Sequence, residues 1–355
     1  MLTVLLMTCA VNSGMAQTPV LKIAATTDRG NWNGVAAAND KRLFADFPRF
    51  DQGSNPSLVE IKKDGSLVPY PSEKWNSWQP GAALDTHFVS LNAVYVNKAD
   101  NHLWVVDAGA PFNGPDLTGA AKIVEIDLAS NQVVNIFPFN RKVAPAGSQL
   151  NDLRIKDNIV YITESGNGAI LVLDRQTKKI RRLLADSKVT KADPAIQPVK
   201  DGRKLEDGKG KVPLTNADQL ELSPDGKTLY FMSPFGPNLY RVATADLLNE
   251  SLTAAQLEEK VTVDRKVAPI GGLVMDDSGN LYLSEILTQS IRCEGPDKKT
   301  KWVITDERLK MPDAYSIAPD GTVYMVASQI VEMPKMQQGK DKRKAPYYIF
   351  SFKPG

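Results

Sequence analysis

Leu150-Asn151-Asp152-Leu153-Arg154 is one copy of a short phrase that occurs six times along the chain. In each copy an Asn or Asp, or Gly in the fifth copy, is followed by alternating apolar residues. The key position of the phrase falls at Asn33, Asn92, Asn151, Asp218, Gly272 and Asp313, at intervals of 41 to 67 residues. Self-similarity at such a period indicates a repeat architecture, in which each copy is one structural unit.

The residues after each phrase have the pattern of further strands. A turn and a second run follow, as in Leu103-Trp104-Val105-Val106-Asp107, and β-branched and aromatic residues dominate these runs. Turns such as Asp225-Gly226 and Asp320-Gly321 supply the left-handed backbone of a tight hairpin. Third runs are expected at 58–62, 122–127, 169–174, 238–242, 289–293 and 347–352, and fourth runs at 66–70, 132–137, 179–184, 259–264 and 301–305.

Six units of four strands predict an all-β fold, a six-bladed β-propeller. The sixth unit lacks a fourth run before Gly355, whereas residues 20–24 have strand character and belong to no unit. We expect this N-terminal strand to complete the last blade, because a closed ring leaves no unpaired edge in the main circle. The alternative is a large antiparallel sandwich whose turns recur by coincidence.

Composition indicates one ordinary globular domain, residues 17–355. Apolar residues make up 42% and charged residues 24% of the 355 residues, and the net charge is only +2. A charge this small argues against a nucleic-acid partner. No organic cofactor is expected, because the sequence contains no Gly-rich phosphate loop. The expected partner is a small molecule, and a monomer is expected.

Residues 1–16 are apolar and uncharged and end in Gly14-Met15-Ala16, which favours a signal peptide cleaved before Gln17. The run is too short to span a bilayer, so no transmembrane segment is expected in the mature chain. The sequence therefore predicts a secreted or periplasmic protein. Lipoprotein anchoring at Cys9 is the alternative, and removal of the leader would leave Cys293 as the single cysteine.

An ordered set of motifs resembles the yellow / major royal jelly protein family. The chain is most similar to a bacterial branch related to L-dopachrome tautomerase, because it lacks the several cysteines of the insect members. The motifs that carry the resemblance are Phe47-Pro48-Arg49, Pro69-Tyr70-Pro71, Leu103–Gly109, Tyr161–Gly166 and Asp218–Gly226. The resemblance implies a propeller that holds a small aromatic or amine-bearing molecule in its mouth. Some members are associated with dopachrome conversion, a tautomerisation that needs only positioned acid and base groups.

The first strand of each blade lines the central channel of a propeller, so the key positions should meet at one rim. Asn33, Asn92 and Asn151 are the predicted ligand-binding amides there, and Asp218 and Asp313 are predicted catalytic carboxylates. Amide and carboxylate oxygens also bind hard divalent cations such as Ca²⁺. As a structural alternative, Asn and Asp at strand starts cap turns through their own side chains.

A more distant resemblance to SMP-30/gluconolactonase propellers adds a metal hypothesis. Their metal-binding phrases match Asn151-Asp152 and Pro312-Asp313, and Asp218 stands where they carry an Asn. The resemblance implies a divalent cation, Ca²⁺ or Zn²⁺, held by Asn151, Asp218 and Asp313. The glutamate that those lactonases use in their first blade is not evident near Asn33.

Other side chains are expected at the same mouth. The second strands of three units end in a carboxylate, at Asp107, Glu164 and Glu285. We predict that Glu164 is a further acid–base group and that Asp107 contacts the ligand. The alternative is that these carboxylates are solvated strand ends. Trp32, Phe88 and Tyr315 flank the phrases and are predicted to form an aromatic wall, unless they serve only as packing.

Three functions fit these features: a small-molecule-binding propeller with isomerase activity, a metal-dependent lactone hydrolase, and a non-catalytic binding propeller. The fold alone implies no chemistry, so the sequence does not decide among them. The polar stretch 185–215 is predicted either to cover the ring mouth as a lid or to be a surface excursion. Residues 251–260 are predicted to form a short helix.

Overall fold

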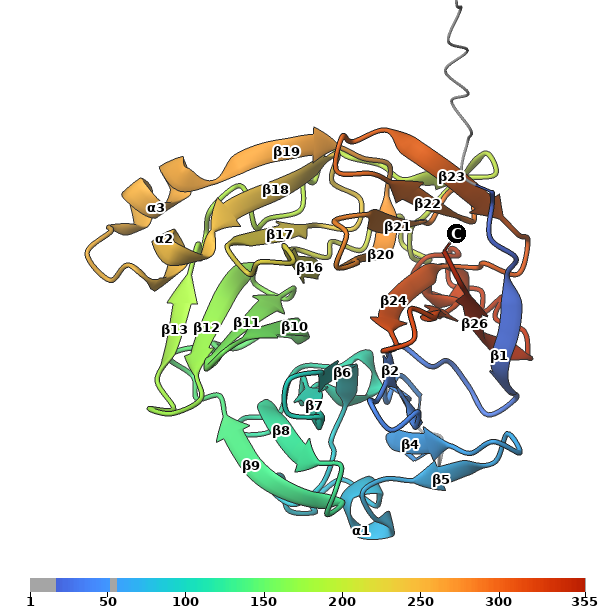
Figure 1. The fold of residues 1–355 in the computed structure, drawn as a ribbon, viewed down its shortest axis with the longest axis horizontal. Helices are drawn as coiled ribbons and strands as arrows, with labels where there is room; N and C mark the ends of the chain where they lie inside the picture. Colours follow the sequence, from blue (N-terminus) through green and yellow to red (C-terminus); the bar gives the residue numbers. More distant parts are fainter. Residues whose placement is uncertain (1–16, 52–55, 355) are drawn as a thin grey trace, which may run out of the picture.

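The computed structural model describes residues 17–51 and 56–354. Six four-stranded antiparallel sheets surround a central axis (Figure 1), which confirms the predicted six-bladed propeller. The predicted signal peptide, residues 1–16, lies outside the described residues.

The first three blades follow the predicted order, with the first strand innermost and the fourth outermost (Figure 1). Blade 1 contains β2 (Val35–Ala37), β3 (Leu43–Asp46), β4 (Leu58–Ile61) and β5 (Leu67–Pro69). Blade 2 contains β6 (Leu91–Asn97), β7 (His102–Asp107), β8 (Lys122–Asp127) and β9 (Gln132–Pro138). Blade 3 contains β10 (Leu150–Lys156), β11 (Ile159–Glu164), β12 (Ala169–Asp174) and β13 (Ile180–Leu183).

The last three blades repeat this pattern. Blade 4 contains β16 (Gln219–Leu222), β17 (Thr228–Met232), β18 (Asn238–Ala243) and β19 (Thr262–Lys266). Blade 5 contains β20 (Ile270–Met275), β21 (Leu281–Glu285), β22 (Ser290–Glu294) and β23 (Thr300–Thr305). Blade 6 contains β24 (Pro312–Ile317), β25 (Val323–Ala327), β26 (Tyr347–Phe352) and the N-terminal strand β1 (Lys22–Thr27).

The N-terminal strand closes the ring, as predicted. Strand β1 pairs antiparallel with β26, from Lys22 opposite Ser351 to Thr27 opposite Tyr347. A buried apolar cluster then joins the last blade to the first, with Val326 and Ile349 packed in the same cluster as Trp32. The two ends of the chain are thus held together by backbone hydrogen bonds and by burial of apolar side chains.

Short helices decorate the ring. Helix α3 (Ala254–Lys260) begins after Thr253, whose side chain accepts from the Gln256 backbone in a capping box. The fourth run of blade 4, predicted from residue 259, begins later because α3 extends to Lys260. The remaining helical segments are α1 (Glu73–Asn76), α2 (Thr244–Leu248), η1 (Pro111–Asn113) and η2 (Ile330–Glu332). No helix in the described part of the chain has the length and apolar character needed to cross a bilayer.

Two long loops meet over one end of the central channel. The 185–215 loop contains the small hairpin β14 (Val199–Lys200) and β15 (Arg203–Lys204) and packs against the β25–β26 loop. The Gln338 N–H donates to the Glu206 carbonyl at 2.8 Å. Leu205 is buried in one apolar cluster with Met336 and other residues of the β25–β26 loop. The stretch 185–215 is therefore part of a cover and not a free surface excursion.

Ring closure predicts a strong effect of truncation. A chain that starts at residue 28 lacks β1, so β26 keeps an unpaired edge and Ala25 leaves the buried cluster. We expect a loss of on the order of 3–5 kcal/mol in the free energy of unfolding, from several strand hydrogen bonds at about 1 kcal/mol each. Chemical denaturation measures it, and a chain that starts at residue 17 is the matched control. Equal stability of the two chains would contradict closure by β1.

Candidate functional site at the covered channel mouth

A β-bulge in the inner strand aims the key residues at the axis. The register between the first and second strands shifts at the phrase in four blades. A bulge of this kind bends the strand and redirects a side chain. The shifts lie between Leu91 and Ala93, Leu150 and Leu153, Ile270 and Leu273, and Pro312 and Tyr315.

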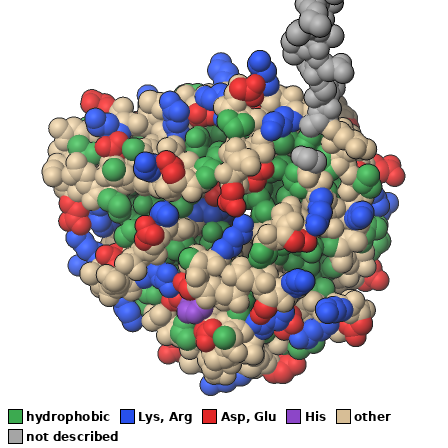
Figure 2. Space-filling view, in the orientation of Figure 1, with side chains coloured by type: hydrophobic (Ala, Val, Ile, Leu, Met, Phe, Trp, Pro, Cys, Tyr) green, Lys and Arg blue, Asp and Glu red, His purple; other side chains and the backbone are tan. Residues whose placement is uncertain are grey.

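The key positions converge on the covered end of the channel. A cavity of about 110 Å³ is lined by five of the predicted residues, namely Asn33, Asn92, Asn151, Asp218 and Asp313. A narrower space of about 30 Å³ continues below it and reaches Gly272. Figure 2 shows the opposite face of the ring, where charged side chains surround an open hollow at the centre. The structure therefore brings the six repeats of the phrase to one place.

The asparagine side chains join neighbouring blades. The Asn33 amide donates to the Asn92 carbonyl at 2.6 Å, and the Asn92 amide donates to the Asn151 carbonyl at 3.1 Å. This is a structural role, though it acts between blades and not as a turn cap. Asn33 Oδ1 is buried and has no hydrogen-bond partner among the described residues. Since an unpaired buried carbonyl is costly, this oxygen is suited to a ligand donor or a cation.

The two predicted catalytic carboxyl groups have strongly raised pKa values. Burial, followed by the charge of Asp152, raises the pKa of Asp218 to about 7, although the hydrogen bond of the Asn151 side chain acts against the increase. Burial and the neighbouring Asp218 raise the pKa of Asp313 well above its usual value, although Ser328 Oγ donates to Asp313 Oδ2 at 3.0 Å. Two carboxyl groups that share a small cavity cannot both ionise easily, so one tends to keep its proton.

Asp46 is a third carboxyl group of this kind, which sequence analysis missed. Its Oδ1 accepts from the Gly34 backbone at 2.7 Å, whereas its Oδ2 is buried without a partner among the described residues. Burial raises the pKa of Asp46 to about 7. A signal was present, because Asp46 ends the second strand of blade 1 as Asp107 does in blade 2.

The structure does not bring Asp107 and Glu164 to the cavity. Asp107 accepts from the backbone of Val89 and Ser90 and pairs with Lys122 at 2.6 Å. Glu164 accepts from three backbone N–H groups and pairs with Arg182 at 2.7 Å. Glu285 similarly pairs with Arg292 at 2.6 Å. Each of these strand-end carboxylates stabilises the adjacent loop of its own blade, because its oxygens accept hydrogen bonds from several donors and pair with a cation.

The aromatic wall differs from the prediction. Trp32 is fully buried and stacks on Phe47 in the core between blades, and Phe88 packs on Trp75. Only Tyr315 lies along the channel, in its narrow part below the cavity. The apolar side chains around the cavity come instead from loops, namely Phe50, Phe235, Met311, Ile330 and Met336. Inner-strand spacing could not reveal them, since no periodic pattern fixes where a loop folds back.

Lys335 is the one cationic residue among the described residues that line the cavity. It belongs to the β25–β26 loop, and its Nζ lies 5.4 Å from the centre of the Phe50 ring. Burial lowers the pKa of Lys335, while the charge of Asp218 raises it. Sequence analysis did not select this lysine, because it stands in a loop outside the repeated phrase.

The family comparison covers most of the ring. The model of the family described as Major royal jelly protein matches residues 89–350, which is well over half of the chain. This chain belongs to the major royal jelly protein family. No curated protein matches it.

Solved structures with the same fold have little sequence identity to this royal jelly family member. Regucalcin, a calcium-binding protein from Agrobacterium tumefaciens, is 12% identical, with a TM-score of 0.56 over 94% of this chain and 96% of that one. A gluconolactonase from Xanthomonas campestris is 13% identical, with a TM-score of 0.54 over 98% and 94%. A streptogramin B lyase is 11% identical, with a TM-score of 0.55 over 97% and 100%. Identities this low show the fold alone.

The opposite end of the channel in this family member holds a wider pocket of about 410 Å³. Arg154 lies at its floor, where it donates to Glu221 at 3.0 Å and to Asp152 at 2.9 Å. The charges of this buried group are thereby largely matched within the protein. None of the key positions of the phrase lines this wider pocket.

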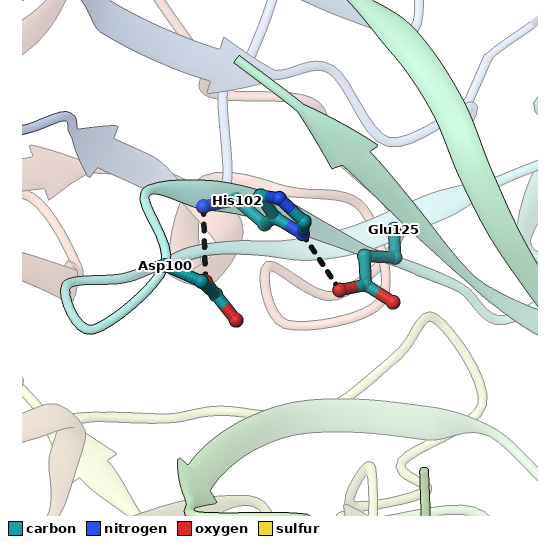
Figure 3. Close-up of side chains that lie close together, drawn as sticks. All are labelled: Asp100, His102 and Glu125. Carbon is teal, nitrogen blue, oxygen red and sulfur yellow. Dashed lines mark hydrogen bonds and ion pairs between the residues drawn. The ribbon is translucent and has the colours of Figure 1, made fainter. Parts of the chain in front are cut away.

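Asp100, His102 and Glu125 form the one cluster of possible metal-ligating residues found among the described residues (Figure 3). His102 Nδ1 lies 2.7 Å from Glu125 Oε1. Arg175 already donates to both carboxylates, at 3.1 Å to Asp100 and 2.6 Å to Glu125. Because a guanidinium holds the position next to these oxygens, the cluster is an ion-pair network and does not favour a cation.

A substitution at Gly272 tests how closely blades 5 and 6 pack at the site. A Cβ at this position would lie 2.3 Å from the carbonyl oxygen of Asp313. We expect Gly272→Ala to cost roughly 1–3 kcal/mol in the free energy of unfolding and to displace Asp313. Gly208→Ala is the control, because its nearest neighbour would be at 3.5 Å and its backbone is not left-handed. Equal thermal unfolding of the two variants would contradict the tight packing.

Proposed function

We propose that this royal jelly family member binds a small molecule with an aromatic or amine group in the covered cavity and isomerises it by proton transfer. The observation that carries the proposal is the pair Asp218 and Asp313, two buried carboxyl groups with raised pKa values in one cavity. The apolar side chains of Phe50 and Phe235 suit the body of such a ligand. The Asn side chains offer hydrogen bonds that orient it.

The carboxyl pair suits a tautomerisation because it offers an acid and a base together. A carboxylate removes a proton from carbon, and the neighbouring protonated carboxyl delivers one to the oxygen or nitrogen at the other end of the conjugated system. No electron is transferred, and the pair ends with one proton as it began. A pKa near the working pH is what such general acid–base catalysis requires.

A direct test combines binding and turnover. Phenethylamine, as a probe for aromatic amines, should bind to the wild type in calorimetry, and dopachrome should lose its absorbance band faster than without protein. We expect Asp218→Asn and Asp313→Asn each to lower turnover by at least ~100-fold, the usual effect of removing a general acid or base. Asp320→Asn, at an exposed turn, is the control. Unchanged turnover in both site variants would exclude the mechanism, and binding without turnover would leave a binding propeller.

A metal-dependent lactone hydrolase is the second candidate, favoured by the unpartnered Asn33 Oδ1 and the crowded carboxyl groups. The donor set fits a hard cation, since Asn151, Asp218 and Asp313 offer oxygens around one axis. A bound Ca²⁺ or Zn²⁺ would polarise an ester carbonyl. In this case Asp218 or Asp313 would accept a proton from the attacking water.

Metal removal separates the two candidates. The hydrolase predicts hydrolysis of gluconolactone that Ca²⁺ or Zn²⁺ stimulates and that a chelator and Asp218→Ala abolish. The isomerase predicts dopachrome turnover that is unchanged by the chelator. Hydrolysis that persists after complete chelation would exclude the metal-dependent mechanism.

The raised pKa of Asp218 has a consequence for stability. In the unfolded chain an Asp titrates near 3.8, and in the folded chain Asp218 titrates at about 7, so the folded state binds more protons between these values. Stability from this group is full below about pH 4 and is lost as the pH rises through about 7. Asp218→Asn removes this loss. In denaturant titrations we expect the free energy of unfolding of the variant, relative to that of the wild type, to increase by on the order of 1–3 kcal/mol as the pH rises from 5 to 8. A constant difference across this range would contradict the raised pKa.

We further propose that the protein is exported to the periplasm or beyond and acts there as a monomer. Support comes from the apolar leader at residues 1–16 in the sequence. Mass spectrometry of the protein recovered from the extracytoplasmic fraction should give an N-terminus at Gln17, and light scattering should give the mass of one chain. A full-length chain confined to the cytoplasm would contradict export.

A further inference from the structure

Lys335 is the one cation among the described residues that line the covered cavity, and its surroundings differ from those of Arg154 and Arg343. Its side chain interacts with the Phe50 ring, at 5.4 Å, and with the more distant charge of Asp218. By contrast, Arg154 and Arg343 each hold carboxylates at hydrogen-bond distance. No ion pair is formed by Lys335 within the described part of the chain.

The surroundings of this amine suit a nucleophile. Its cavity is walled by apolar side chains, which include Phe235, Ile330 and Met336. The titratable side chains among the lining residues are Lys335, Asp218 and Asp313. Desolvation lowers the pKa of Lys335 and so increases the fraction of free amine. A desolvated lysine opposite a proton donor is the arrangement used for attack on carbonyl groups.

We propose that Lys335 captures a small aldehyde or ketone as an imine within the covered cavity, with Asp218 or Asp313 as the proton donor. This activity uses the cavity of the proposed function but does not require that its ligand be isomerised. It assigns to the cover a chemical role as well as the exclusion of water, because the reacting amine is part of the β25–β26 loop.

The step balances without a further reactant. The amine nitrogen forms a bond to the carbonyl carbon, and the carbonyl oxygen takes a proton from the protonated carboxyl group. The nitrogen releases a proton to the resulting carboxylate. The hydroxyl group then leaves as water with a second proton from the same donor, a C=N bond forms, and the nitrogen returns its remaining proton to the carboxylate. Amine and carbonyl thus give imine and water, with no change in oxidation state.

Reductive trapping tests this inference on the full wild-type chain. Propanal and cyanoborohydride are added at about pH 6.5, where the hydride reduces the imine to a stable secondary amine. Peptide mapping then gives the propylation rate of each lysine. We expect Lys335 to react several-fold faster than Lys63, an exposed lysine, because the lowered pKa of Lys335 increases its fraction of free amine at this pH. A rate at Lys335 equal to or below that of Lys63 would overturn the inference.

Two variants test whether the fast adduct forms at Lys335 itself. Lys335→Arg keeps the charge and Lys335→Met keeps an unbranched chain, so both should fold, as judged by thermal unfolding, and both should lose the fast adduct. A fast adduct that persists at another lysine in either variant would overturn the assignment to Lys335. Calorimetry with phenethylamine distinguishes this result from failure of the proposed function, since it reports binding at Asp218 and Asp313 without imine formation.

Discussion

Closure of the ring places a constraint on every inner strand, because six strands face one axis that has little room for water. Polar groups there have to be satisfied by neighbouring blades or by a ligand. The Asn33 and Asn92 amides meet this requirement by donating to the next blade. At the covered mouth Asn33 Oδ1 has no partner among the described residues, and burial raises the pKa values of Asp218 and Asp313.

Much of this arrangement could be predicted from the sequence, because periodic features encode it. The repeat of the phrase gives the blade count and places Asn151 and Asp313 in inner strands and Asp218 directly before one. Residues outside the repeat were not predictable in the same way. Lys335 and Phe50 reach the cavity from irregular loops, whose path depends on tertiary contacts. The partners of Glu164 were also hidden, since Arg182 lies on a different strand and pairs with it only after folding.

The cover links the loops to the chemistry of the mouth. The 185–215 loop and the β25–β26 loop pack on each other through Leu205 and Met336, and the second loop carries Lys335 over the carboxyl groups. Burial therefore acts on both kinds of group at once: it raises the pKa of the carboxyls and lowers the pKa of the amine. Such opposite shifts in one cavity are typical of acid–base sites.

The chemistry proposed for the covered mouth requires a carboxyl group that keeps its proton near neutral pH. Infrared difference titration follows the protonated carboxyl band in the wild type and in Asp218→Asn. We predict protonated carboxyl absorbance in the wild type that is lost with a midpoint at about pH 7, and a smaller loss at this midpoint in the variant, in which Asp46 still titrates near pH 7. A wild type whose carboxyl groups have all ionised below about pH 5, near the ordinary range of Asp and Glu, would contradict this assignment.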